Sequence, residues 1–79
     1  MELSDALSKR LNALLKEKHL TQYRLGKSMG IPQSTISQIR NAHIPSPKIS
    51  TIAPIAWGLG VTLSEFFNDP LFDEGNLNL

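Results

Sequence analysis

Short polar side chains recur through the segment 22–41, which reads QYRLGKSMGIPQSTISQIRN. Between residues 33 and 41 they carry amide and hydroxyl groups and, apart from one arginine, no charge. A glutamine amide can bond adenine bidentately, hydroxyls can bond several base edges, and a threonine methyl can pack on a thymine methyl. The chemistry that this segment favours is therefore hydrogen bonding to base edges in the major groove of double-stranded DNA.

Helical periodicity separates these polar groups from an apolar stripe. At 100° per residue, Ile36 and Ile39 fall on one side of a helix, and we expect that side to be buried and the polar side to face outward. A solvated polar face without a partner is the alternative interpretation, and for an arbitrary helix it would be the better one. The candidate base-reading residues are Gln33, Ser34, Thr35, Ser37 and Gln38.

Two short helices joined by a turn would position this polar face. Leu25 and Met29 form an apolar pair at i, i+4 spacing on the first helix, and Gly30 follows it where a left-handed backbone is easiest without a side chain. A helix-turn-helix also needs a small residue where the two backbones approach, and Gly26 supplies it. The spacing therefore predicts a helix-turn-helix over residues 22–41.

A second set of residues, at the ends of these helices and in the loop that follows, suits DNA phosphates. Gln22 begins the first helix, where free N–H groups and the helix dipole attract an anion. Basic side chains nearby add attraction to the phosphate backbone. The phosphate-binding candidates are Gln22, Arg24, Lys27, Arg40, Asn41, Ser46 and Lys48. For Gln22 and Asn41, helix capping is the alternative interpretation.

The rest of the chain predicts three further helices and no strand, so the fold class is all-α. Either Ser4 or Asp5 can cap the first helix, and Pro54 should cause a late start or a kink in the fourth. Residues 1–68 should form one compact helix-turn-helix domain, and residues 69–79, which show no clear period, a C-terminal tail. We expect the helices at about 4–18, 22–29, 33–41, 49–58 and 63–68.

Composition is that of an ordinary globular domain. The 79 residues are 41% hydrophobic and 19% charged, with a net charge of +1, which favours a single domain that folds alone. All eight lysines and arginines lie in the first 48 residues, whereas four of the seven acids follow residue 64. There is no cysteine and no apolar run long enough to span a bilayer. We therefore expect a cytoplasmic, nucleoid-associated protein with no membrane partner.

Catalysis and cofactor binding find no support in the sequence. His19 and His43 lack the spacing and the acidic companions of a metal site. The acids form no general acid/base pair, and no serine lies in a GxSxG context. We expect no enzyme, no metal and no cofactor, and double-stranded DNA as the main partner.

From about Ser4 to Phe67 the chain resembles the phage repressor and Cro-like helix-turn-helix family, also called the Xre type, with a lambda-repressor-like domain. The resemblance is carried by LTQYRLGKSMGIPQSTISQIRN, the proline-bearing loop after it, IAWGLGV and TLSEFF. It implies a five-helix DNA-binding domain, a transcriptional repressor, and a homodimer on a palindromic operator. By position it also implies phosphate contacts by Gln22 and Asn41, and base contacts by Gln33, Ser34, Ser37 and Gln38.

The chain departs from the family pattern at an ion pair. The family often pairs an arginine on the first helix with a glutamate near the end of the recognition helix, and those positions here hold Leu15 and Arg40. Losing both partners leaves no orphaned buried charge, so an apolar contact by Leu15 can replace the pair. We hypothesise that Arg40 is free to contact the DNA backbone or Glu17. A second departure is Arg24, where a glutamate commonly completes a capping box with Thr21.

The C-terminal end carries more apolar bulk than so small a domain is expected to bury. The candidates for a homodimer interface are Trp57, Phe67, Leu71 and Phe72, with core packing or chance exposure as the alternatives. The last residues, LFDEGNLNL, are both acidic and apolar, and they support a different function, that of an antitoxin or adaptor whose tail binds a protein partner. If the protein is an adaptor, truncation at Asp69 should abolish binding of its protein partner. If it reads DNA, the same truncation should abolish dimerisation at most.

Overall fold

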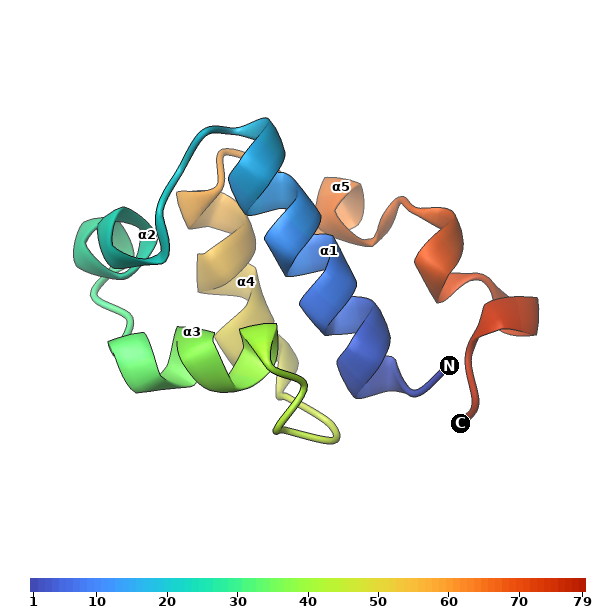
Figure 1. Cartoon of the computed structure of the whole chain (residues 1–79). Coiled ribbons are helices and arrows are strands. Elements are labelled where there is room, and N and C mark those ends of the chain that lie inside the picture. The colour runs from blue at the N-terminus through green and yellow to red at the C-terminus, as the bar shows by residue number, and fades with distance from the viewer.

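The structure, a computed structural model, describes residues 1–79 and contains five α-helices followed by two short 3₁₀ turns (Figure 1). The helices confirm the all-α expectation, and each of their ends lies within one residue of its predicted position. No helix combines the length and the apolar character needed to cross a membrane. The elements are α1 (Leu3–Glu17), α2 (Gln22–Met29), α3 (Gln33–Arg40), α4 (Ile49–Gly58), α5 (Leu63–Phe67), η1 (Pro70–Phe72) and η2 (Glu74–Asn76).

Helix α1 runs through the middle of the molecule, with α2 and α3 on one side and α5 with the C-terminal turns on the other (Figure 1). Its leucines recur at helical spacing, so Leu7, Leu11 and Leu14 are buried along one face. They belong to a core of 13 buried residues to which all five α-helices contribute. Burial of each large aliphatic side chain stabilises the fold by about 1.5–3 kcal/mol, which explains how a small chain holds α3 in place.

The expectation about the cap of α1 was wrong, and so was one alternative for the effect of Pro54 on α4. Helix α1 begins one residue early, and its first turn closes on the backbone carbonyl of Glu2, so neither Ser4 nor Asp5 caps it with a side chain. Helix α4 begins at Ile49, at its predicted position, and continues past Pro54, so of the two expected effects of this proline the late start is wrong. The burial of four α4 side chains in the core supplies packing that outweighs the missing backbone hydrogen bond.

Two helix starts are capped by threonines, to different extents. The Thr21 hydroxyl accepts the Arg24 backbone N–H at 3.2 Å, and no acidic side chain returns the bond. At α5 the Thr62 hydroxyl accepts the Glu65 N–H at 3.0 Å, and the Glu65 carboxylate accepts the Thr62 N–H at 2.9 Å. Only α5 therefore has a complete capping box.

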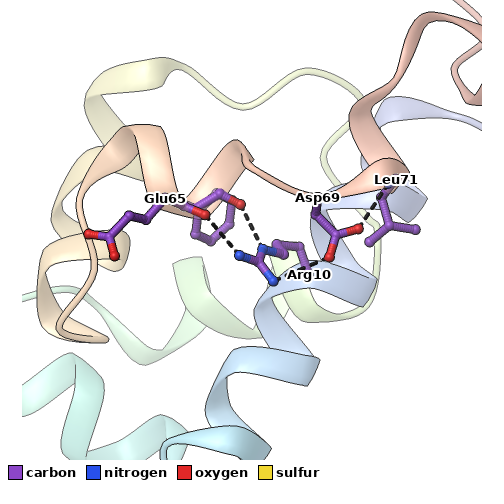
Figure 2. Close-up of polar contacts among 5 residues, drawn as sticks. Arg10, Glu65, Asp69 and Leu71 are labelled. Carbon is purple, nitrogen blue, oxygen red and sulfur yellow. Dashed lines mark hydrogen bonds and ion pairs between the residues drawn. The ribbon is translucent and has the colours of Figure 1, made fainter.

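The chain after α5, which we expected to be a tail without regular elements, is fastened to α1 by Arg10 (Figure 2). Arg10 Nε donates to the carbonyl oxygen of Phe66 at 2.7 Å, and its Nη2 donates to that of Glu65 at 2.8 Å. Arg10 Nη1 pairs with Asp69 Oδ2 at 3.3 Å, and Asp69 Oδ1 accepts the backbone N–H of Leu71 at 2.9 Å. One guanidinium thus closes the end of α5 and holds the start of η1.

Aromatic packing by Phe72 also holds the C-terminal segment (residues 69–79) against the helices. The rings of Phe67 and Phe72 meet edge to face, with centroids 4.9 Å apart. The buried ring of Phe66 lies 6.4 Å from that of Phe72 and 5.2 Å from that of Phe67. The apolar bulk of the C-terminal end is therefore largely used within the chain.

The two termini lie side by side (Figure 1). The Met1 amino group donates to the carbonyl oxygen of Asn76 at 2.7 Å, and the Asn78 N–H donates to the carbonyl oxygen of Met1 at 2.9 Å. Glu2 and Asn78 form an isolated parallel bridge. These bonds close the C-terminal segment onto the start of α1.

Candidate nucleic-acid interface

Two glycines shape the turn between α2 and α3. Gly26 is buried, and a Cβ on it would lie 2.8 Å from the carbonyl oxygen of Ile31 and against the side-chain amide of Gln33. Gly30 ends α2 with a φ of +67°, in the left-handed region. Both glycines occupy the roles that their spacing predicted, so the helix-turn-helix is present.

The polar side of α3 faces outward. Ile36 and Ile39 are buried in the core, which fixes the rotation of the helix about its axis. None of the base-reading candidates is buried. Ser34 and Gln38 are exposed, and Gln33, Thr35 and Ser37 are half-buried.

Gln33, at the N-terminal end of α3, is held in one orientation instead of projecting freely. Its Nε2 donates to the carbonyl oxygen of Tyr23 at 3.1 Å. Its own backbone carbonyl accepts a hydrogen bond from Gln22 Nε2 at 3.2 Å. The Gln33 Oε1 atom and the second N–H of its Nε2 have no partner in the chain, so one acceptor and one donor remain available side by side.

The phosphate-binding candidates fall into two groups. Gln22, Arg40 and Asn41 line a single hollow of about 350 Å³ together with Asn12. We call this space the Arg40 hollow. The other candidates are exposed one by one on α2 or in the loop between α3 and α4: Arg24, Lys27, Ser46 and Lys48.

Arg40 is held by amide groups and not by a carboxylate. Its Nε donates to Asn12 Oδ1 at 2.6 Å, and its Nη1 donates to Gln22 Oε1 at 3.1 Å. It forms no ion pair, so of the two partners that we hypothesised for it, the DNA backbone and Glu17, Glu17 is not contacted. Leu15 is buried in the core, in agreement with the expectation that an apolar contact replaces the family's ion pair.

Sequence analysis missed Ser8 and Asn12, which bring α1 to the end of α3. Ser8 Oγ donates to the backbone carbonyl of Arg40 at 2.5 Å, and Asn12 Nδ2 donates to the same oxygen at 3.3 Å. Asn12 therefore contacts both the backbone and the guanidinium of one residue. The available signal was a pair of short polar residues at i, i+4 spacing beside the leucine stripe of α1.

The four dimer-interface candidates differ in exposure. Phe67, Leu71 and Phe72 are half-buried, and the two phenylalanines pack against this chain's own core. Trp57, on α4, is 59% exposed. Of the four, Trp57 is therefore the side chain with most of its surface open to a second copy.

Comparisons with known proteins agree with this geometry. A family model described as helix-turn-helix matches residues 11–66. The HTH-type transcriptional regulator PuuR of Escherichia coli (strain K12) is 37% identical over 65 residues, which are 82% of this chain and 35% of that protein, and the protein of the same name from Shigella flexneri matches equally well. The crystal structure of the prophage Lp1 protein 11 has a TM-score of 0.79 at 28% identity, covering 94% of this chain and 99% of that one.

The matched region thus covers nearly the whole length of the solved structure but only part of the curated relatives. The chain spans about a third of the length of the two PuuR proteins. The helix-turn-helix lies inside the region matched by the family model, together with the second half of α1, α4 and most of α5. This chain belongs to the helix-turn-helix family, in its phage repressor and Cro-like (Xre-type) branch.

Proposed function

We propose that this protein is a DNA-binding transcription regulator that reads a specific double-stranded sequence with α3. The outward polar face of α3 supports the proposal most directly, because buried isoleucines hold it and none of its base-reading candidates is buried. Its curated relatives are named as transcriptional regulators. Such a protein would act on the nucleoid in the cytoplasm.

The orientation of Gln33 supports adenine as one of the bases read. Its free Oε1 can accept a hydrogen bond from the adenine N6 amino group, while its free Nε2 hydrogen donates to N7. The bonds to the Gln33 amide and backbone reduce the freedom that the side chain would lose on binding. Ser34 and Gln38, which are exposed, are the neighbouring candidates for base contacts.

Selection of bound fragments from a random duplex pool tests the proposal. We expect one enriched sequence containing an A·T pair, and a log affinity that falls linearly with log salt by roughly 0.9 for each phosphate neutralised. Gln33→Ala should abolish the preference at the A·T pair, at a cost of about 1–3 kcal/mol for that base. Binding that is absent, or equal for all sequences, would refute this function.

The proposed regulator is a repressor that binds a palindromic operator as a homodimer. Two copies related by a twofold axis would place their α3 helices in successive major grooves about 34 Å apart. The enriched sequence should then contain two inverted half-sites with that spacing. A single unrepeated half-site would count against the dimer without affecting DNA reading.

The second candidate function, a protein-interaction module, depended on a free C-terminal tail. The segment instead packs on α1 and α5 through Phe72 and Asp69. Truncation at Asp69 would remove the partner of Arg10 and uncover aromatic rings, so loss of a partner after truncation could reflect a damaged fold. The structure therefore gives this alternative no specific support.

A further inference from the structure

The Arg40 hollow lies where α1, α2 and α3 meet. Asn12 comes from the middle of α1, Gln22 begins α2, and Arg40 ends α3. All four lining residues, Asn41 included, are polar, and none is acidic. A half-buried cation in a hollow without a carboxylate is an arrangement that attracts an anion.

The amides that hold Arg40 orient its guanidinium without neutralising it. Two of its five N–H groups are used, one by Asn12 and one by Gln22. One N–H on Nη1 and both on Nη2 have no partner in the chain. A carboxylate in place of Asn12 could accept the same Arg40 Nε–H, but it would cancel the charge, and it could not donate to the Arg40 backbone carbonyl as the Asn12 amide does.

A single hydrogen-bonded chain connects this guanidinium to the start of α3. Gln22 accepts from Arg40 through Oε1 and donates through Nε2 to the backbone carbonyl of Gln33. The same Gln33 carries the amide proposed to read adenine. An anion bound by Arg40 is thereby connected to the position of a base-reading residue.

We propose that the Arg40 hollow binds one phosphodiester group of duplex DNA and that Asn12 is the residue that positions Arg40 for it. The inference rests on the proposed function and assigns a role to Asn12 that the helix-turn-helix pattern does not contain. Asn12 touches no DNA in this role, because it acts through the guanidinium. The planar fork that it holds matches two oxygens of a phosphate.

The test measures DNA affinity against salt for three variants, by fluorescence anisotropy on the selected duplex. Arg40→Gln should bind about tenfold more weakly and reduce the steepness of log affinity against log salt by about 0.9 per bound copy. Asn12→Asp should show the same shallower slope, because its carboxylate neutralises the fork in place. Asn12→Ala should weaken binding while keeping the wild-type slope, because the charge remains but its orientation is lost.

Controls separate the phosphate contact from a general effect on folding. Lys9→Gln removes a cation of α1 that is exposed and outside the hollow, and it should leave affinity and slope unchanged. Urea unfolding without DNA should show that Asn12→Asp is folded under the conditions of the binding assay. Arg40→Lys retains the charge but loses the planar fork, so it should keep the salt dependence of the wild type and bind DNA more weakly. This variant replaces Arg40→Gln in the test if Arg40→Gln does not fold.

The outcomes distinguish this inference from the function on which it rests. If wild-type protein binds no duplex specifically, the proposed function fails. If it binds, and Arg40→Gln and Asn12→Asp bind with unchanged salt slopes, the phosphate site is refuted. Saturable binding of inorganic phosphate alone, with DNA binding insensitive to these variants, would also refute it, because the hollow would then be a small-anion site.

Discussion

At the scale of single residues, the backbone directly after α3 is strained. Ala42, which follows the end of α3, has a φ of +57°, in the left-handed region that favours glycine. Hydrogen bonds hold it there, because its N–H donates to Ile39 and the next N–H, of His43, donates to Gln38. The end of α3 therefore carries a conformational cost, because an alanine and not a glycine occupies this left-handed position.

Replacing Ala42 by glycine should raise the free energy of unfolding by about 0.5–1 kcal/mol. The left-handed conformation costs an alanine about 1–2 kcal/mol, and the greater freedom of glycine in the unfolded chain cancels part of the gain. Ala13→Gly, on an exposed face in the middle of α1, is the matched control and should lower the free energy by about 1 kcal/mol. Urea unfolding checks both signs, and a loss of stability in both variants would show that Ala42 is not strained.

At the scale of elements, stability at the C-terminal end depends on contacts between α1, α5 and η1. Arg10 supplies three of them from one side chain, and its side chain is only 17% exposed. Because the carbonyls that it satisfies lie in the last turn of α5, the same contacts act as a cap on that helix. The five residues of α5 could not hold a helical end alone.

Arg10→Met should lower the free energy of unfolding by about 2 kcal/mol, because two carbonyls and Asp69 lose a charged donor while the aliphatic part is retained. Chemical denaturation with the far-ultraviolet circular dichroism signal provides the measurement. Lys9→Met, one residue away and exposed, is the control and should change stability by less than about 0.5 kcal/mol. Equal stability of the two variants would contradict the assigned role of Arg10.

The capping box of α5 should make stability depend on pH. The backbone N–H and the hydroxyl of Thr62 lower the pKa of Glu65 below its ordinary value of 4.5. A carboxyl with a lowered pKa stabilises the fold above its unfolded pKa, and that stability is lost as pH falls through the folded pKa. The unfolding free energy should therefore fall more steeply below pH 4.5 in the wild type than in Glu65→Gln, which keeps an amide oxygen at the cap; parallel pH profiles would contradict this.

At the scale of the whole molecule, charge and exposed apolar surface are unevenly distributed. Three of the exposed cations, Arg24, Lys27 and Lys48, lie on or beside the helix-turn-helix. The four acids after residue 64 lie on α5 and the C-terminal segment, on the other side of α1 (Figure 1). This separation favours one orientation toward a polyanion even though the net charge is only +1. Trp57 remains as a large aromatic that the fold leaves mostly open.

If the proposed homodimer forms through Trp57, then Trp57→Glu should give a monomer at concentrations where the wild type is a dimer. Sedimentation velocity over a concentration series measures the state of each. Tyr23→Ser removes the other strongly exposed aromatic, which is 62% exposed, and should leave the dimer intact. A wild type that stays monomeric at all concentrations, or a Trp57→Glu variant that still dimerises, would exclude this interface.

Local pattern was enough to predict the helices, the turn and the outward face of α3. Leucine and isoleucine spacing defines which side of each helix is buried, and Gly26 and Gly30 mark a close approach and a left-handed turn that other residues resist. These signals act over a few residues, so they can be read before any tertiary contact is known. The capping box at α5 is an equally local pattern, of Thr62 with Glu65, but we did not predict it.

Only the tertiary structure decided how Arg40 and Arg10 are used. Arg40 meets Asn12 across 28 residues of sequence, and Arg10 meets Asp69 across 59. Nothing local selects those partners, because many polar groups along the chain could have satisfied either guanidinium. The choice follows from helix packing, which brings the middle of α1 against the end of α3 on one side and against the chain after α5 on the other.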